Sequence, residues 1–273
     1  CALIHDDVMD GSDTRRNKPA IHKLFESLHD DSSYQGNSER FGLASAILLG
    51  DLALVWADRL LVESGVTREE FINAQSVFSD MRDELMAGQY LDVLEGALAT
   101  TSVERSLKVA RFKSGKYSIE RPLHLGVAIA LGSPSKDNPL NWKLSEFGLP
   151  LGEAFQLRDD LLGIFGDPDI TGKPAGDDLR EGKRTVLMAM AMERTTDAGR
   201  TELISYLGRP DLSHEIIEVL RGIIIDSGAV ESVEGLIEKL TYDALQASQS
   251  HEIAPDAHDL LSALAASATA RKS

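Results

Sequence analysis

Two acidic clusters interrupt sequence that is otherwise apolar, and their side chains could hold divalent metal ions. The first cluster contains Asp6, Asp7 and Asp10, and the second contains Asp159 and Asp160. Carboxylates that crowd together repel one another, and burial would raise their pKa values until some took up protons. Multivalent cations remove this conflict. A site made only of oxygen ligands favours a hard ion such as Mg²⁺, which shares its coordination shell with the phosphates of a substrate.

The spacing of the acids gives both clusters the same arrangement. On a helix that turns by about 100° per residue, the first acid of each cluster lies at about 0°, the second at about 100°, and the residue four positions after the first at about 40°. That last position holds Asp10 in the first cluster and Gly163 in the second. A solvated helix face, or charges placed at a helix N-terminus, is the alternative. Two clusters of matching geometry, both flanked by apolar residues, favour the metal site.

The Asp-Asp dipeptide by itself carries little information. Asp30-Asp31 and Asp177-Asp178 also contain it, but they lie in polar sequence rich in turn formers. We therefore set these two pairs apart from the apolar clusters.

Basic residues follow both acidic clusters. Arg15 and Arg16 come just after the first cluster, where guanidinium groups beside a metal could bind one diphosphate. Two surface arginines in a turn are the alternative.

Residues 166–185 carry Lys173 and Lys183 among glycines. Two near-matches to a nucleotide P-loop fail here because five residues separate the glycines and the Ser/Thr position holds another residue. We predict a flexible lid whose lysines close over a phosphate, with a mobile surface loop as the alternative.

The elements that must position these residues are helices. Apolar residues recur at intervals of three and four through most of the chain, which predicts an all-α fold. No break is long and polar enough for a linker, so residues 1–273 are expected to form one domain. The expected helices cover residues 1–9, 38–64, 68–94, 103–119, 122–131, 140–165, 183–192, 200–207, 213–228, 230–249 and 255–270.

Composition excludes several classes of function. The chain has 28 Lys and Arg against 44 Asp and Glu, a net charge of −16, so no nucleic-acid partner is expected. Cys1 is the only cysteine, which excludes an internal disulfide and a Cys-based zinc site and favours a cytoplasmic location. The apolar stretch 41–61 carries Asp51, Asp58 and Arg59, so no transmembrane segment is expected.

These residues together resemble the motifs of the trans-isoprenyl (polyprenyl) diphosphate synthase family. The first cluster with Arg15 and Arg16 is similar to D-D-x-x-D-x-x-x-x-R-R, and Phe155 and Gln156 with the second cluster are similar to F-Q-x-x-D-D. Further segments resemble the family's G-D-x-L, G-Q-x-x-D, K-T/S and phosphate-binding lysine motifs, and they lie at residues 50–52, 88–92, 113–114, 171–173 and 182–185. The resemblance runs in the family's order from Cys1 to about Met192.

The resemblance implies an isoprenoid synthase-type helical bundle around a central cavity, usually a homodimer. The acidic helices would face each other and bind about three Mg²⁺ around an allylic diphosphate, which reacts with isopentenyl diphosphate to give a chain longer by five carbons. The implied catalytic residues are Asp6, Asp7, Asp10, Asp159, Asp160, Lys113 and Gln156. The implied substrate-binding residues are Arg15, Arg16, Lys113, Ser114, Gln156, Lys173 and Lys183.

Product length is expected to depend on Cys1 and Ala2. In the family, bulky residues four and five positions before the first Asp form the floor of the tail cavity, and both positions are small here. The expected product is therefore geranylgeranyl diphosphate or somewhat longer. The family's G-G-K-R-x-R-P segment, which lies upstream of the first acidic motif, has no counterpart here. Because the sequence also begins inside an apolar pattern, we expect N-terminal helices to be absent from it.

Three other functions compete with this interpretation. A class I terpene cyclase would share the fold and the first motif, but its N-D-x-x-S-x-x-x-E motif is not found. A non-catalytic regulatory subunit of a prenyl synthase would more naturally have lost an acidic cluster, and both are present. A plain metal-binding helical module would bind Mg²⁺ without needing a diphosphate.

Overall fold

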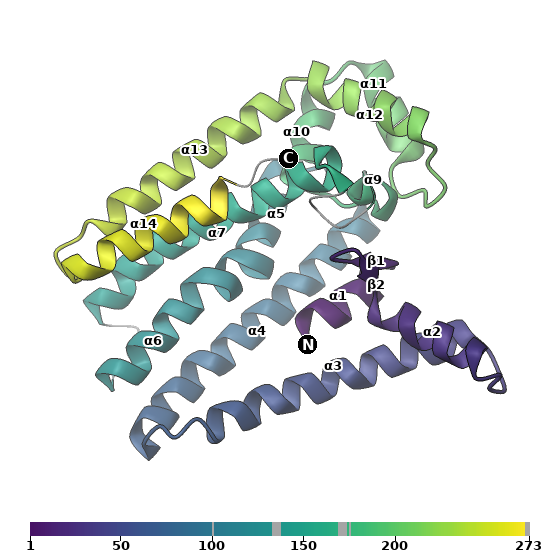
Figure 1. Ribbon diagram of the computed structural model, residues 1–273. Helices are drawn as coiled ribbons and strands as arrows, with labels where there is room; N and C mark the ends of the chain where they lie inside the picture. The colour runs from purple at the N-terminus through teal and green to yellow at the C-terminus, as the bar shows by residue number, and fades with distance from the viewer. Residues whose placement is uncertain (100, 133–137, 169–173, 175, 271–273) are drawn as a thin grey trace.

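Helices make up most of the described chain in the computed structural model, as the apolar periodicity predicts (Figure 1). The structure describes residues 1–99, 101–132, 138–168, 174 and 176–270. The N-terminal half contains α1 (Ala2–Asp10), β1 (Thr14–Arg15), β2 (Lys18–Pro19), α2 (Ile21–Asp31), α3 (Ser38–Val62), α4 (Arg68–Leu98), α5 (Val103–Val109), η1 (Ala110–Glu120) and α6 (Arg121–Leu131). The C-terminal half contains α7 (Pro139–Phe165), α9 (Asp177–Glu181), α10 (Val186–Arg194), α11 (Asp197–Tyr206), α12 (His214–Asp226), α13 (Ala229–Ser248) and α14 (Pro255–Thr269).

A hairpin and two helices of the described chain were not predicted from the sequence. The antiparallel hairpin β1–β2 pairs Thr14 with Pro19, and α9 lies inside the expected lid segment. The third is α2, which packs against α3. Its apolar residues Ile21, Leu24, Phe25 and Leu28 follow the i, i+3, i+4, i+7 spacing of an amphipathic helix, so the signal for it was present.

A π-helical segment, η1, continues from α5 and packs against both α4 and α7. Glycines on these two neighbours allow the close approach. A Cβ on Gly88 of α4 would lie 2.4 Å from the backbone nitrogen of Lys113, and one on Gly152 of α7 would lie 2.3 Å from the Cα of Gly115. Segments of π-helix inside α-helices are frequent at functional sites, and this one carries the expected site residues Lys113 and Ser114.

Helix α7 is central to both groups of buried apolar side chains. One group, which includes Leu157 and Leu220, joins α7 to α10, α12 and α13. The other, which includes Phe147 and Leu261, joins α7 to η1, α6 and α14. Because α7 is packed on several sides, the second acidic cluster lies on a rigid element.

Helix α3 presents an apolar face to solvent. Leu48, Val55 and Leu60 are each at least 60% exposed. Among the residues that the structure describes, α3 alone has the length and composition of a bilayer-spanning helix, with a mean hydropathy of 1.6 over a window of which 17% is buried. These two criteria by themselves are weak evidence for a membrane span.

The buried imidazole of His124 on α6 predicts acid sensitivity of the fold. Its Nε2 lies 3.0 Å from the carbonyl oxygen of Asn141, and its Nδ1 lies 3.3 Å from Nη1 of Arg121, so the neutral ring with its proton on Nε2 fits both partners. Burial lowers the pKa of His124 below its usual value of 6.5, and Arg121 and Lys116 add to this against the opposing effect of Glu120.

We expect the free energy of unfolding to fall as the pH drops below about 6.5, because the unfolded chain then binds a proton that the folded His124 does not. A single such group contributes a slope of up to about 1.4 kcal/mol per pH unit. Urea unfolding at several pH values checks this, and His124→Gln should flatten the slope. The matched substitution His251→Gln, at a side chain that is 92% exposed, should not. Equal slopes for all three proteins would contradict the prediction.

Candidate functional site

A cavity of about 800 Å³ lies at the end of the bundle where α1, the hairpin, α4, η1, α7 and α9 meet. Both acidic clusters reach it, as their helical phases predict. The expected site residues that line it are Ala2, Asp6, Arg15, Arg16, Lys113, Ser114, Gln156, Asp159, Asp160 and Lys183. The structure therefore brings together residues that lie up to 181 positions apart, since Ala2 and Lys183 face one hollow.

Lys113 lies between α1 and α4. Its Nζ is 2.6 Å from a carboxylate oxygen of Asp92 and 3.1 Å from one of Asp6, while the Gln89 amide donates to the same Asp6 oxygen at 3.1 Å. Burial opposes the charge of Lys113, but Asp92 and Asp6 outweigh it and raise the pKa of Lys113. Burial likewise opposes the charge of Asp6, and the positive charges of Lys113 and Lys183 hold the pKa of Asp6 below its usual value. Both side chains are therefore charged at neutral pH.

Lys183 makes a second bridge, between α1 and α9. Its Nζ lies 2.7 Å from Glu181, 3.0 Å from Asp10 and 3.5 Å from Asp178. Burial would lower the pKa of Lys183, but Asp178, Asp10 and Glu181 raise it well above the usual value. For Asp10, burial dominates over Lys183, so the pKa of this carboxyl is raised.

Of the first cluster, Asp6 is part of the cavity wall, whereas Asp7 and Asp10 are not. Asp7 is 3% exposed. Arg15 Nε donates to both of its oxygens, at 2.8 and 2.9 Å, and Nη2 of the same arginine lies 2.6 Å from Oδ1. Asp7 therefore fixes Arg15 at the cavity wall. The spacing of the acids alone could not distinguish such a contact from binding of a metal ion.

On α7 and η1, a chain of hydrogen bonds orients the second cluster. Ser114 donates to Oε1 of Gln156, and the Gln156 amide donates to Oδ1 of Asp160 at 2.7 Å. Asp160 is 4% exposed, and its burial together with the nearby charges of Asp178 and Asp159 raises its pKa to about 8. This crowding of carboxyl groups is what a bound cation relieves.

Asp178 of α9 is a cavity-lining residue that the sequence analysis set aside. It is 8% exposed, and a Cβ built on Gly163 would lie only 2.0 Å from its Oδ2. The Asp178 carboxylate thus occupies the space beside Gly163, the position at which the first cluster carries its third acid. One residue of this polar segment could have indicated that it is buried. Leu179 is apolar, is fully buried in the structure and anchors α9.

The remaining expected residues have mixed outcomes. Arg16 has a left-handed backbone with φ of 53° and lines the cavity. Cys1 is not in the wall, and its Sγ instead lies 3.8 Å from Nδ1 of His5. Lys173 lies outside the described residues, as do residues 169–172 and 175 of the expected lid.

The donor set around this cavity fits a hard divalent cation. Carboxylates from α1, α4, α7 and α9 line one hollow, and oxygen ligands are those that Mg²⁺ prefers. In the described ranges, no group of three or more acidic, histidine or cysteine side chains is arranged to hold a metal ion. Lys113, Lys183 and Arg15 pair instead with Asp6, Asp10 and Asp7.

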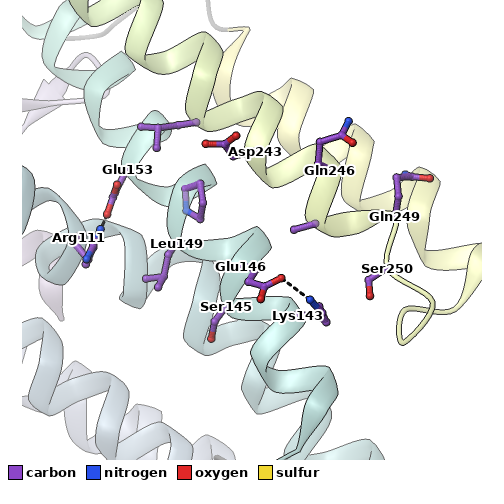
Figure 2. A pocket seen from close by; sticks show the side chains of 13 residues that line it. Arg111, Lys143, Ser145, Glu146, Leu149, Glu153, Asp243, Gln246, Gln249 and Ser250 are labelled. Atoms are coloured by element: carbon purple, nitrogen blue, oxygen red, sulfur yellow. Dashed lines mark hydrogen bonds and ion pairs between the residues drawn. The ribbon is translucent and has the colours of Figure 1, made fainter.

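A second cavity, of about 820 Å³, lies between η1, α7 and α13 (Figure 2). None of the expected site residues lines it. Two ion pairs lie within its wall, since Arg111 Nε lies 2.5 Å from Glu153 and Lys143 Nζ lies 2.8 Å from Glu146. This cavity has neither acidic cluster nor the basic residues that follow them.

Comparisons with known proteins identify the family to which this chain is similar. The family model described as Polyprenyl synthetase matches residues 1–223. A geranylfarnesyl diphosphate synthase of Aeropyrum pernix is 34% identical over 236 residues, which are 85% of this chain and 66% of that protein. A geranylgeranyl diphosphate synthase of Mycobacterium tuberculosis is 33% identical over 212 residues, 76% of this chain and 53% of that protein. The chain thus spans about half to two thirds of the length of these relatives.

Solved structures are similar over nearly the whole chain. A geranylgeranyl pyrophosphate synthase from Corynebacterium glutamicum, complexed with isoprenyl diphosphate and magnesium, has a TM-score of 0.95 at 44% identity and covers 100% of this chain and 76% of its own. A polyprenyl synthase from Caulobacter crescentus CB15, complexed with calcium and isoprenyl diphosphate, has a TM-score of 0.79 at 27% identity, with coverages of 99% and 74%.

Proposed function

The chain belongs to the polyprenyl synthetase family, and on that premise we propose that it is a Mg²⁺-dependent prenyltransferase. It condenses isopentenyl diphosphate with an allylic diphosphate, head to tail and in the trans configuration, to give geranylgeranyl diphosphate or a somewhat longer product. The observation that carries the proposal is the convergence of both acidic helices, α1 and α7, on one cavity whose wall also holds Arg15, Lys113 and Lys183.

The acids would hold the metal. Asp6 on α1 and Asp159 and Asp160 on α7, which line the cavity, would bind about three Mg²⁺ together with Asp10, whose carboxylate lies 3.0 Å from Nζ of the wall residue Lys183. Asp178 of α9 is a further carboxylate beside Gly163. When bound, the ions supply positive charge that offsets the charge of the departing diphosphate. Asp7 acts through Arg15, whose guanidinium it fixes.

The chain's own cations stabilise the leaving group. When the allylic C–O bond breaks, its electron pair stays with the diphosphate, and Arg15, Lys113 and Lys183 donate hydrogen bonds to that growing charge. Because the charge is larger in the transition state than in the bound substrate, these contacts speed the reaction and do more than bind. Gln156 and Ser114, held by their mutual hydrogen bond, line the wall beside the carbocation.

The second substrate completes the step. The double bond of isopentenyl diphosphate attacks the allylic cation, a new C–C bond forms, and loss of a proton from the product gives a chain five carbons longer. Arg16, which lines the cavity, would hold isopentenyl diphosphate. Lys173 would add a further contact to a phosphate.

We place the enzyme in the cytoplasm as a homodimer. The exposed apolar face of α3 supports self-association, because contiguous apolar surface is typical of subunit interfaces. The single cysteine supports a reducing compartment.

The decisive test is incubation of the protein with labelled isopentenyl diphosphate, Mg²⁺ and, separately, dimethylallyl, geranyl or farnesyl diphosphate, followed by sizing of the products. We expect extension of at least one primer, with the diphosphate retained on the product. Release of a hydrocarbon or alcohol would indicate a cyclase instead. Failure to extend any primer would refute the proposal.

Ala2 on α1 lines the cavity, so its size should affect product length. We expect Ala2→Phe to shift the products toward fifteen carbons, because the phenyl ring would take space that the tail needs. Chromatography of the dephosphorylated products checks this. The same change at an exposed alanine of α14, Ala263→Phe, serves as the control and should leave the distribution as it is. An unaltered distribution in Ala2→Phe would place the floor on another helix.

A further inference from the structure

The ends of α1 and α9 are joined by four side chains, Asp10, Ser12, Glu181 and Lys183, which we call the α1–α9 ring. The Ser12 hydroxyl donates to Oε1 of Glu181. Nζ of Lys183 lies 2.7 Å from Oε2 of the same glutamate and 3.0 Å from Oδ2 of Asp10. Because Ser12 follows Asp10 by two residues, both contacts from the end of α9 meet the chain where it leaves α1.

Two glycines with left-handed backbone make the α1–α9 ring possible. Side chains two positions apart on a helix do not face each other, yet Glu181 and Lys183 do. Gly182, which lies between them with φ of 73°, ends α9 and turns the chain so that both side chains reach the same place. Gly11, with φ of 69°, ends α1 in the same way, and the backbone N–H of Ser12 then donates to a carbonyl oxygen of the last turn at 3.0 Å.

Glu181 differs in its place from the other acids beside Lys183. Asp178, 3.5 Å from Lys183, is part of the cavity wall, whereas Glu181 is not, and its side chain is only 6% exposed. Asp10 and Asp178 are also proposed to bind metal ions. Of the three carboxylates that the described chain places beside Lys183, Glu181 is thus the one that the proposed function leaves without a role.

Binding of metal ions would change the charge around Lys183. Once Asp10 and Asp178 bind a metal ion, their negative charge is no longer available to the ammonium, and like charges then repel one another. A largely buried cation without an acid beside it is strongly unfavourable, so Lys183 would leave the wall unless another carboxylate holds it. Glu181 can hold it, because Ser12 fixes one of its oxygens while the other contacts Nζ.

We infer that Glu181, fixed by Ser12, is the counter-ion that keeps Lys183 at the cavity wall when metal ions occupy the acids, so that the ammonium meets the departing diphosphate. Glu181 is therefore a positioning residue that acts through Lys183. This role rests on the proposed function. If Glu181 only ties α9 to α1, its loss will lower stability and leave the metal requirement unchanged.

The test compares Glu181→Gln in the unmodified protein and in Lys183→Met. Without Glu181 the ammonium settles on Asp10 and Asp178, and Mg²⁺ must displace it. We expect the Mg²⁺ concentration for half-maximal activity to rise, and kcat at saturating Mg²⁺ to fall, each by about tenfold, within the range for a group that supports a metal site. In Lys183→Met there is no ammonium to displace or hold, so Glu181→Gln should change neither quantity by more than about twofold.

Calorimetric titration of Mg²⁺ into each protein with inorganic diphosphate gives the same comparison without prenyl transfer. Glu181→Gln should weaken Mg²⁺ binding by about tenfold in the unmodified background only. An equal change in both backgrounds overturns the inference, because the loss of one negative charge would by itself weaken Mg²⁺ binding with or without Lys183. No change in either background also overturns it. A failure of the proposed function looks different, because the unmodified protein would then extend no primer.

Ser12→Ala is the second variant, because it keeps every charge of the α1–α9 ring and removes only the hydroxyl that fixes Glu181. It should raise the Mg²⁺ requirement by about threefold, the scale of one hydrogen bond. Should Glu181→Gln or Lys183→Met not fold, an unaltered Mg²⁺ requirement in Ser12→Ala overturns the inference.

The matched control is Glu153→Gln. The Glu153 side chain is 8% exposed, pairs with Arg111 and lines the second cavity (Figure 2). This variant loses a similarly buried and paired carboxylate away from the α1–α9 ring, so it should keep the Mg²⁺ requirement and kcat of the unmodified protein. A rise in its Mg²⁺ requirement equal to that of Glu181→Gln would show a general effect of lost charge and count against the inference.

Discussion

Replacing Asp6 with Asn should lower kcat/KM for prenyl transfer by about 10²–10³-fold, the scale on which one preorganised electrostatic group contributes to catalysis. Asp6 is the acid of the first cluster that lines the cavity and pairs there with Lys113 at 3.1 Å. Its loss would remove a proposed metal ligand and leave the Lys113 ammonium to Asp92 alone, at 2.6 Å. Initial rates over a range of Mg²⁺ concentrations would show both a lower maximum and a higher Mg²⁺ requirement.

The matched control is Asp30→Asn, since Asp30 belongs to an Asp-Asp pair on α2 and its side chain is 66% exposed. It should retain full activity and the same Mg²⁺ dependence. An Asp6→Asn protein that works within about twofold of the unmodified one at every Mg²⁺ concentration would remove Asp6 from the metal site and weaken the whole assignment.

The sequence predicted the site best where the geometry is local. Asp6 and Asp10 share a helical arc because they are four residues apart, and the same spacing relates Gln156 to Asp160, which the structure joins by a hydrogen bond. Helical phase depends only on spacing, so these positions needed no tertiary information. The period of the apolar residues similarly predicted the long helices, including α4 and α7, to within a few residues.

Contacts across the fold were beyond such reasoning. Nothing in the spacing says that Asp92 would meet Lys113, or that Asp7 would turn away from the cavity to hold Arg15. The polar pair Asp177-Asp178 looked like solvated sequence because its neighbours are polar. Asp178 is buried because α9 packs against α7. The sequence of neither helix, taken alone, indicates that the two pack together.

The contact between Gly163 and Asp178 leads to a second large effect. A Cβ on Gly163 would lie 2.0 Å from Oδ2 and 2.4 Å from Cγ of Asp178, so Gly163→Ala must push the carboxylate out of the site. Asp178→Gly removes it outright. We expect either change to lower kcat/KM by about 10–100-fold, the usual cost of losing a group that supports a metal site.

The double variant Gly163→Asp/Asp178→Gly should recover most of that loss, to within about tenfold of the unmodified protein, because it restores one carboxylate to the same space from α7 instead of α9. Gly163→Asp alone should stay impaired, since two carboxylates then compete for one position. Kinetics of the three proteins with Mg²⁺ titrations measure the coupling. If the losses of the single variants simply add in the double variant, Asp178 does not stand in for a third acid of the second cluster, and its role is confined to pairing with Lys183, 3.5 Å away.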